Sequence, residues 1–215
     1  MDFELIFRIY PYFLEAAWVT VQLSVYSILL GLIVGALITS AKLSRSRVLR
    51  IAGTVYVSVF RGTPALIQLF ILYFGGPQIG INLDAFEAGV IGLGLNIGAY
   101  MAETMRGAII AVDKGQNEAA RTIGMGRFQT MRKVILPQAA RLMIRPLGVN
   151  INAQIKATAL VSAISVVELT YTAQRYIGST YKPFEMFFLA GVIYMVMIYM
   201  TGLGINWLDR RAVIK

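Results

Sequence analysis

The 215-residue sequence contains no cysteine and no histidine, and only 14% of its residues are charged. The missing residue types exclude zinc fingers, histidine ligation of haem, disulfides, thiol nucleophiles and Ser-His-Asp catalysis. We therefore expect no metal site and no enzymatic activity in this chain. Soluble domains average about 25% charged residues, whereas 57% of this sequence is hydrophobic. The composition indicates a membrane protein.

Long apolar runs dominate the chain. Crossing a hydrocarbon core of about 30 Å takes roughly 20 helical residues, and five runs are long enough. They lie near residues 16–41, 51–74, 86–111, 147–169 and 185–207. Spanning β-strands would instead be short alternating segments. The predicted fold class is therefore all-α, a five-helix polytopic membrane protein forming a single domain over residues 1–215. The amino terminus lacks a basic region and a cleavage site, so we expect no cleaved leader.

The positive charges predict the orientation of the chain. The sequence has 20 Lys and Arg against 11 Asp and Glu, a net charge of +9. Fourteen of the basic residues fall in segments 42–50, 112–146 and 208–215, against three in the opposite segments and three within spans. The positive-inside rule puts the first set in the cytoplasm, with the amino terminus outside and the carboxyl terminus inside. Because the charges lie between apolar runs, we expect contact with anionic membrane lipids and none with nucleic acid.

One connection between predicted spans is long, the cytoplasmic segment 112–146. Connections of this length are usually functional. Asp113 or Asn117 can cap the start of a short helix, which would put Glu118 in its first turn and Arg121 in its last. Both charges then favour the helix dipole.

Glycines predict a bend after that helix. Gly124 and Gly126 end it, because glycine readily takes the left-handed conformation at a carboxyl cap. A second amphipathic piece, from Arg127 to Leu136, should stop at Pro137, which cannot continue a helix. We expect two short helices that meet at a bend facing the cytoplasm.

The residues of this segment resemble the EAA loop of ABC importer permeases. That pattern is Glu-Ala-Ala, three residues, Gly, nine residues, Ile, one residue and Leu-Pro. Here it is matched by Glu118-Ala119-Ala120, Gly124 and Leu136-Pro137, with Val134 in place of the usual Ile. The alternative interpretation is a solvated amphipathic connector with no partner.

The sequence also resembles the polar amino-acid permease subfamily, which is the histidine, glutamine, arginine and cystine type. This resemblance extends from about Thr20 to Trp207. Further motifs carry it: Phe60-Arg61-Gly62-Thr63-Pro64, Ala99-Tyr100 with Glu103 and Arg106, Gly115-Gln116, Leu136-Pro137-Gln138-Ala139, and Lys156 with Thr158.

This resemblance implies a type I ABC importer permease in the bacterial inner membrane. Such a subunit passes a polar amino acid or a derivative, delivered by an extracytoplasmic solute-binding protein, into the cytoplasm by alternating access. The implied partners are a second permease subunit, either the same chain or a homologue, and a cytoplasmic ATPase dimer. No Gly-x-x-x-x-Gly-Lys-Ser/Thr loop occurs in the sequence. We therefore expect no cofactor in this chain, with ATP and Mg bound by the ATPase.

The resemblance also implies that residues 116–136 form the coupling helix, which docks on the ATPase. Small alanines allow close approach, and the charged residues fix the register. The candidate coupling residues are Glu118, Ala119, Ala120, Arg121, Gly124, Arg127, Leu136 and Pro137.

Charged residues inside the predicted spans are costly and are normally paired or face a cavity. Counting about 1.5 Å per residue from the cytoplasmic ends puts Arg61, Glu103 and Lys156 at similar depths, about 15, 12 and 14 Å. We expect Glu103 to be the counter-ion of Arg61, Lys156 or both, either as a static cluster or as a pair that changes partners. Arg106 is shallower and should reach the inner interface.

Polar residues in the fourth span recur at helical spacing: Asn150, Gln154, Thr158, Ser162 and Ser165. Such a stripe either lines a pathway or joins helices. Pro64 should bend the second span, and freed backbone groups near a bend can face a cavity. The candidate residues for the pathway or the charge cluster are Arg61, Thr63, Asn96, Glu103, Gln154, Lys156, Thr158 and Ser162.

Two glycine pairs, Gly31 with Gly35 and Gly94 with Gly98, permit close helix packing.

The outer segments have a weak acidic excess, Asp84, Glu87, Glu168 and Glu185 against Arg175 and Lys182, which does not identify a substrate. Two other functions are compatible with the sequence, an ATP-independent amino-acid channel or carrier and a membrane scaffold. Five spans without a detectable inverted repeat argue against the usual plan of a secondary carrier.

Overall fold

The computed structural model describes residues 3–213. Met1 and Asp2, where we expect no leader, and Lys215, counted among the cytoplasmic basic residues, lie outside the described residues. All elements in the described range are helical, which confirms the all-α class. They are α1 (Phe3–Leu43), α2 (Arg47–Gly62), α3 (Ala65–Phe70), η1 (Ile71–Gly75), η2 (Gly76–Ile79), α4 (Ala85–Ala111), α5 (Lys114–Thr122), α6 (Arg127–Thr130), η3 (Met131–Ile135), α7 (Leu136–Ala157), η4 (Thr158–Ile164), α8 (Leu169–Thr180) and α9 (Pro183–Val213).

Three of these helices, α1, α4 and α9, are individually long and apolar enough to cross a membrane. Two further candidate spans are broken. Arg47–Gly62 and Ala65–Ile79 meet at 103°, and Arg127–Ile164 and Leu169–Thr180 meet at 49°. If each bent pair is one span, the total is five, in agreement with the sequence.

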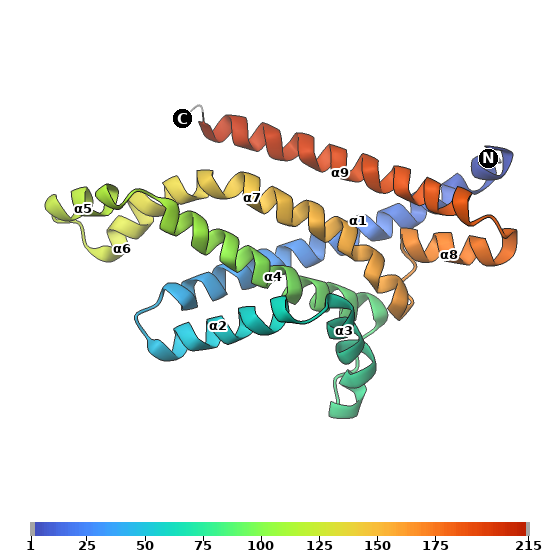
Figure 1. Cartoon of the computed structure of the whole chain (residues 1–215), viewed down its shortest axis with the longest axis horizontal. Coiled ribbons are helices and arrows are strands. Elements are labelled where there is room, and N and C mark those ends of the chain that lie inside the picture. The colour runs from blue at the N-terminus through green and yellow to red at the C-terminus, as the bar shows by residue number, and fades with distance from the viewer. Residues whose placement is uncertain (1–2, 214–215) are drawn as a thin grey trace.

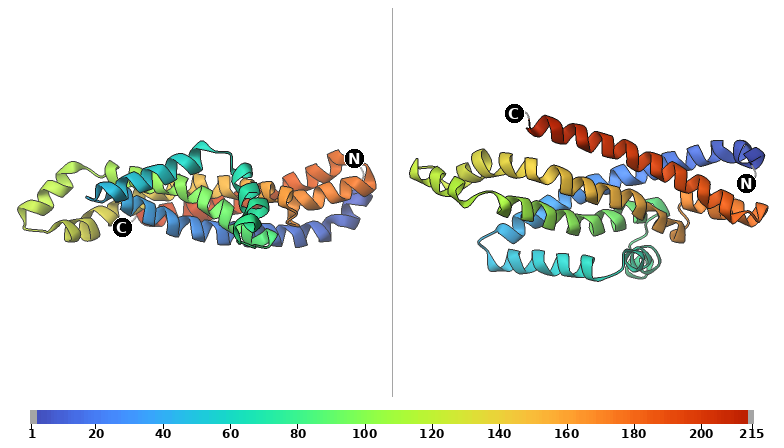
Figure 2. Two further views of the ribbon diagram at one scale, coloured as in Figure 1. Left: turned by 90° about the horizontal axis from the view of Figure 1, so that it is seen from below. Right: turned by 45° about the horizontal axis from the view of Figure 1, so that its top comes forward.

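The long helices form an elongated bundle. In Figure 1, α1, α4, α7 and α9 run along the long axis, while α3 turns across it. Both views in Figure 2 show α5 and α6 projecting beyond the other helices at the end opposite the amino terminus. The α1–α2 connection and the last turns of α9 lie toward that same end. The three basic segments are thus gathered at one end, as the predicted orientation requires.

The helices α1 and α4 pack closely through the two predicted glycine pairs, Gly31 with Gly35 and Gly94 with Gly98. A Cβ atom added at Gly31 would lie 2.4 Å from Cγ2 of Ile97, far inside van der Waals contact. Glycine is needed there because the side chain of Ile97 occupies the space that a Cβ atom would take. The close packing predicted from these pairs is confirmed.

The bend predicted at Pro64 is also confirmed. Thr63 has an extended backbone, with φ −121° and ψ 147°, and ends α2. Steric clash with a following proline disfavours the helical conformation at this position. The chain then starts α3 in a new direction.

Pro137 does not end a helix, so that prediction was wrong. The chain passes from α6 through the π-helical turn Met131–Ile135 into α7, and Pro137 lies in the first turn of α7. Proline is tolerated in the first turn of a helix, because a backbone N–H there would have no acceptor within that helix. Only Gly124 and Gly126 interrupt the cytoplasmic segment, and α7 rises directly from it.

Candidate functional site at the cytoplasmic end and the α2–α3 bend

The helix α5 begins at Lys114, and its capping residue is Asp113, one of the two predicted caps. The Asp113 carboxylate accepts a hydrogen bond from the Gly115 backbone N–H at 2.7 Å. Glu118 therefore lies beyond the first turn, which corrects its predicted position, because the helix starts four residues earlier. Arg121 is in the last turn, as predicted.

The bend after α5 is a defined turn rather than a loose loop. Gly124 has φ +77°, a left-handed conformation that glycine adopts without steric cost. Its N–H donates to the Arg121 carbonyl, and the Met125 N–H donates to the Ala120 carbonyl, each at 3.0 Å. This pair of bonds is the Schellman motif, and it fixes the direction in which the chain turns back.

Packing against α7 holds the segment in place. Val112, Ile135 and Ala139 form a buried cluster at its base. Ala120 is 4% exposed, and the Gln138 side chain donates to the Gln116 side-chain oxygen at 3.2 Å, joining α7 to α5. Ala120 thus serves internal packing, whereas Ala119 is exposed.

The outer surface of the segment is apolar at its tip and charged beside it. Ile123 and Phe128, on either side of the glycine bend, are each 76% exposed. The exposed side chains of Glu118 and Arg121 have no hydrogen bond or ion pair within residues 3–213. A rigid tip with exposed large apolar groups and unpaired charges is suited to binding another protein.

Sequence reasoning missed Ile123 and Phe128. The available signal was two large apolar residues flanking Gly124-Met125-Gly126 in a polar segment. Arg127 lines a groove of about 260 Å³ together with Asn117 and Arg121. Leu136 is 41% exposed where α7 begins.

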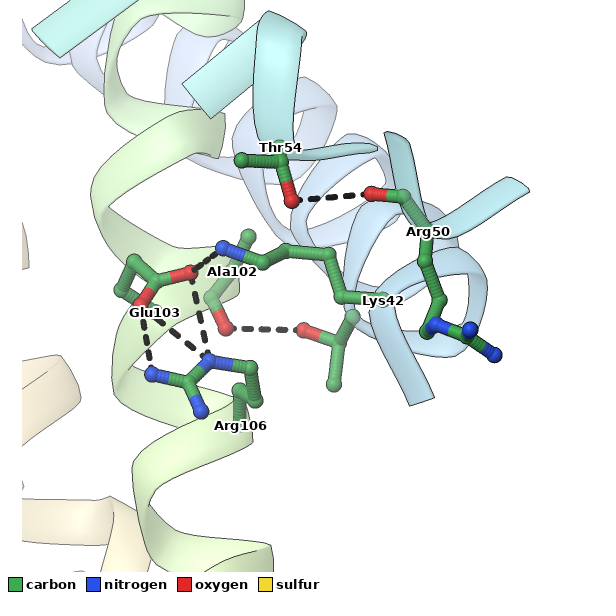
Figure 3. Close-up of polar contacts among 7 residues, drawn as sticks. Lys42, Arg50, Thr54, Ala102, Glu103 and Arg106 are labelled. Carbon is green, nitrogen blue, oxygen red and sulfur yellow. Dashed lines mark hydrogen bonds and ion pairs between the residues drawn. The ribbon is translucent and has the colours of Figure 1, made fainter. Parts of the chain in front are cut away.

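The second polar group is centred on Glu103 in α4. Its carboxylate forms an ion pair with Lys42 at the end of α1 and accepts hydrogen bonds from Arg106, the shortest at 2.8 Å (Figure 3). The Thr39 hydroxyl donates to the Ala102 carbonyl at 2.9 Å beside it. This cluster ties the cytoplasmic ends of α1 and α4 together.

The expected pairing of Glu103 with Arg61 or Lys156 was therefore wrong. Counting residues gives the depth of a charge but not its direction around the helix axis. Arg106, expected at the interface, also pairs with Glu103. The Arg61 guanidinium lies over the Tyr100 ring, 5.1 Å from its centroid. Lys156 lines a separate groove of about 420 Å³ beside Tyr194 on α9.

A third polar group surrounds the α2–α3 bend. The Gln68 amide donates to the Thr63 hydroxyl at 2.7 Å and to the carbonyls of Thr63 and Phe60 at 3.1 and 3.0 Å. The Asn96 amide donates to the same Phe60 carbonyl at 3.1 Å and to the Gln68 side-chain oxygen at 3.0 Å. The structure thus joins two predicted residues, Thr63 and Asn96, through Gln68, which sequence reasoning missed. The sequence feature that could have identified Gln68 is its amide side chain four residues after Pro64.

The polar residues of the fourth span do not form one continuous stripe. The chain changes from α-helix to 3₁₀-helix at Thr158, so four-residue spacing no longer keeps side chains on one face. Gln154 is buried and donates to the Ser27 hydroxyl at 2.7 Å, and Asn150 donates to the Thr104 hydroxyl at 2.8 Å. These bonds join α7 to α1 and α4. The hydroxyl of Ser162 donates to the Ala159 carbonyl within η4.

Glu168 is not part of an outer acidic surface, which corrects that expectation. It is fully buried, caps α8 by accepting from the Tyr171 N–H at 2.7 Å, and accepts from the Tyr194 hydroxyl at 2.8 Å. Thr158 lies beside the same hydroxyl at 3.3 Å.

Asp84 and Glu87 form a capping box at the start of α4, so these two acids have a structural role as well.

Comparison with known proteins identifies relatives over nearly the whole chain. The family model described as "Binding-protein-dependent transport system inner membrane component" matches residues 27–214. The "Probable amino-acid ABC transporter permease protein PatM" of Vibrio harveyi is 37% identical, over 98% of this chain and 96% of PatM. The nopaline transport system permease protein NocM of Agrobacterium fabrum is 35% identical, over 94% of this chain and 88% of NocM.

A solved structure is similar as well. A chain from the crystal structure of an amino acid ABC transporter with histidines matches with a TM-score of 0.93 and 36% identity, over 98% of this chain and 99% of that chain. The similarity covers the broken spans and the cytoplasmic segment together.

Proposed function

The chain belongs to the family of binding-protein-dependent transport system inner membrane components, and from this premise we propose how its parts divide the work of an ABC importer. The chain is the transmembrane permease subunit and performs no chemistry of its own. A separate cytoplasmic ATPase dimer binds ATP and Mg and docks on the segment 112–146. A solute-binding protein delivers the substrate at the opposite end.

The observation that carries this proposal is the rigid tip formed by α5 and α6. Ile123 and Phe128 are available for burial in an ATPase cleft, and Glu118 and Arg121 beside them offer unpaired charges to fix the register. Because α7 continues from the tip without a stop, movement of the docked ATPase reaches the broken fourth span directly.

The substrate in this proposal is a polar amino acid or a derivative of one. The names of the relatives support this class, since they include amino-acid and nopaline permeases. The α2–α3 bend presents the exposed polar side chains of Arg61 and Thr63, and the hydrogen bonds of Gln68 hold Thr63 in place. Such groups suit the polar surface of an amino acid, so we assign the pathway to this side of the bundle.

A second permease subunit, the same chain or a homologue, completes the pathway. Within residues 3–213, neither Arg61 nor Lys156 has an acidic partner. Unpaired charges at membrane depth require either a water-filled cavity or a neighbouring protein. A dimer of permeases provides both between its subunits. Thr158 and Ser162 then lie on the pathway side of the broken fourth span, where their hydroxyls donate to the carbonyls of Ile155 and Ala159.

The test is substrate-stimulated ATP hydrolysis. The chain is co-expressed with the ATPase and the solute-binding protein encoded beside its gene, and the complex is reconstituted in lipid. Polar amino acids plus binding protein should stimulate hydrolysis, and Glu118→Lys should abolish the stimulation without reducing membrane insertion. Arg210→Glu is the matched control, because it also reverses one exposed charge at the cytoplasmic end but lies on α9, outside the α5–α6 tip. Absence of an associated ATPase would refute the proposal and leave a channel, carrier or scaffold.

A further inference from the structure

A basic groove lies between the end of α1 and the start of α2, separate from the coupling segment. Its volume is about 410 Å³, and its lining residues are Lys42, Arg47, Arg50, Ile51, Thr54 and Val55. Three of these six residues are cationic and two are aliphatic. The five on α2 recur at spacings of three and four, so they share one face of the helix.

Arg50 is held with one edge of its guanidinium available. Its Nη1 donates to the carbonyls of Ser44 and Arg45, at 3.0 and 2.8 Å, which uses both of the N–H groups on that nitrogen. The remaining Nε and Nη2 N–H groups form the edge that binds two phosphate oxygens at once. The side chain points away from the Glu103 cluster (Figure 3).

The groove carries excess positive charge that the described chain does not neutralise. Glu103 is the single carboxylate paired with both Lys42 and Arg106, so that cluster keeps one net positive charge. Within residues 3–213, neither Arg47 nor Arg50 has an acidic partner. The groove therefore attracts an anion.

The position of the groove indicates which anion. Along the long axis, the α1–α2 connection lies well short of the α5–α6 tip and near the ends of α4 and α9 (Figures 1 and 2). The candidate span Glu4–Leu43 ends at this connection, so we expect the groove to lie where the span meets the lipid headgroups. Ile51 and Val55 are 53% and 55% exposed beside the cations. A ligand with a phosphate and an attached hydrocarbon chain matches both parts of the lining.

We propose that this groove binds one anionic phospholipid of the inner leaflet. Arg47 and Arg50 hold the phosphate, and Ile51 and Val55 contact an acyl chain. Basic pockets between helices at the cytoplasmic face are suited to anionic headgroups. The bound lipid would join α1 to α2 beside the cluster that joins α1 to α4.

The experiment is native mass spectrometry of the full chain released from nanodiscs of equal phosphatidylglycerol and phosphatidylcholine. The ratio of the two lipids in the first retained position should favour phosphatidylglycerol. Arg47→Gln should lower this ratio about fivefold, and the double variant Arg47→Gln with Arg50→Gln about 30-fold, which corresponds to about 1 kcal/mol per basic residue. Arg47→Gln removes no hydrogen bond within residues 3–213, so loss of folding does not obscure its result.

The matched control is Arg210→Gln with Arg211→Gln, which removes the same charge from the same end of the bundle. It should keep the wild-type ratio within about twofold. An equal loss in this control would show a general surface effect and overturn the proposal. Displacement of the lipid by sodium phosphate, at an ionic strength where sodium chloride has no effect, would assign the groove to free phosphate instead. Variants that keep the lipid ratio but lose the ATPase would assign it to protein docking.

Discussion

Adding one methyl group between α1 and α4, by Gly31→Ala, should destabilise the bundle. The new Cβ would lie 2.4 Å from Cγ2 of Ile97, and carbon atoms pack at about 3.5–4.0 Å, so the two atoms would be about 1.1–1.6 Å too close. Ile97 is 5% exposed, and a β-branched side chain on a helix has essentially one rotamer, so the side chain cannot turn aside. Backbone atoms of Gly94 and Gly98 follow at 3.4 Å. The helices must separate, at a cost of about 1–3 kcal/mol.

A matched variant isolates this steric cost. Gly107→Ala lies on α4 with nothing within 4 Å of the added Cβ, so it gains the helix propensity of alanine without the clash. In thermal unfolding in detergent, Gly31→Ala should melt about 2–12 °C below Gly107→Ala, since 1 kcal/mol shifts the midpoint of a chain of this size by about 2–4 °C. Equal melting temperatures would refute the close packing of the two helices.

Three further changes test the functional regions. Ile123→Ala with Phe128→Ala should weaken ATPase binding about 30-fold or more in a titration of the reconstituted permease, because each side chain loses about 1–2 kcal/mol of apolar burial; unchanged affinity would exclude the tip from the interface. Glu103→Gln should lower the free energy of unfolding by about 1–2 kcal/mol, because two partly buried cations lose their carboxylate; chemical denaturation measures this, and Lys42→Gln with Glu103→Gln should recover part of the loss. Gln68→Ala should reduce transport at normal membrane levels, because the carbonyls at the α2–α3 bend lose a donor, at about 1–3 kcal/mol; a normal uptake rate would remove the bend from the pathway.

Much of the fold follows from residues whose effect is local. Pro64 broke its span where expected, because a proline restricts the residue before it. Gly124 ended its helix, because the turn requires a positive φ. The pair Gly31 and Gly35 on α1 packs against the pair Gly94 and Gly98 on α4, because only small residues allow the two helices to lie so close. Such residues affect the backbone within a few positions, so their effect can be predicted without knowing the helix that packs against them.

The wrong predictions concern features that depend on a neighbouring helix or on an irregular turn elsewhere in the chain. The depth of Glu103 could be predicted from the sequence, but its neighbours depend on which face of α4 packs against α1. Its partner Lys42 also lies just outside the predicted first span. Pro137 is tolerated because it lies in the first turn of α7, and nothing in its local sequence marks the π-helical turn after which α7 begins. The change to 3₁₀-helix at Thr158 likewise broke a pattern that assumed α-helical spacing.

Cross-linking from the tip tests the central claim most directly. The chain has no cysteine, so Ile123→Cys gives a single site for a benzophenone maleimide label. Ile79→Cys is the control, because Ile79 is also 76% exposed but lies on η2, away from the tip. On illumination of the assembled importer, label at position 123 should capture the ATPase and label at position 79 should not. Capture from both positions, or from neither, would contradict docking of the ATPase at the α5–α6 tip.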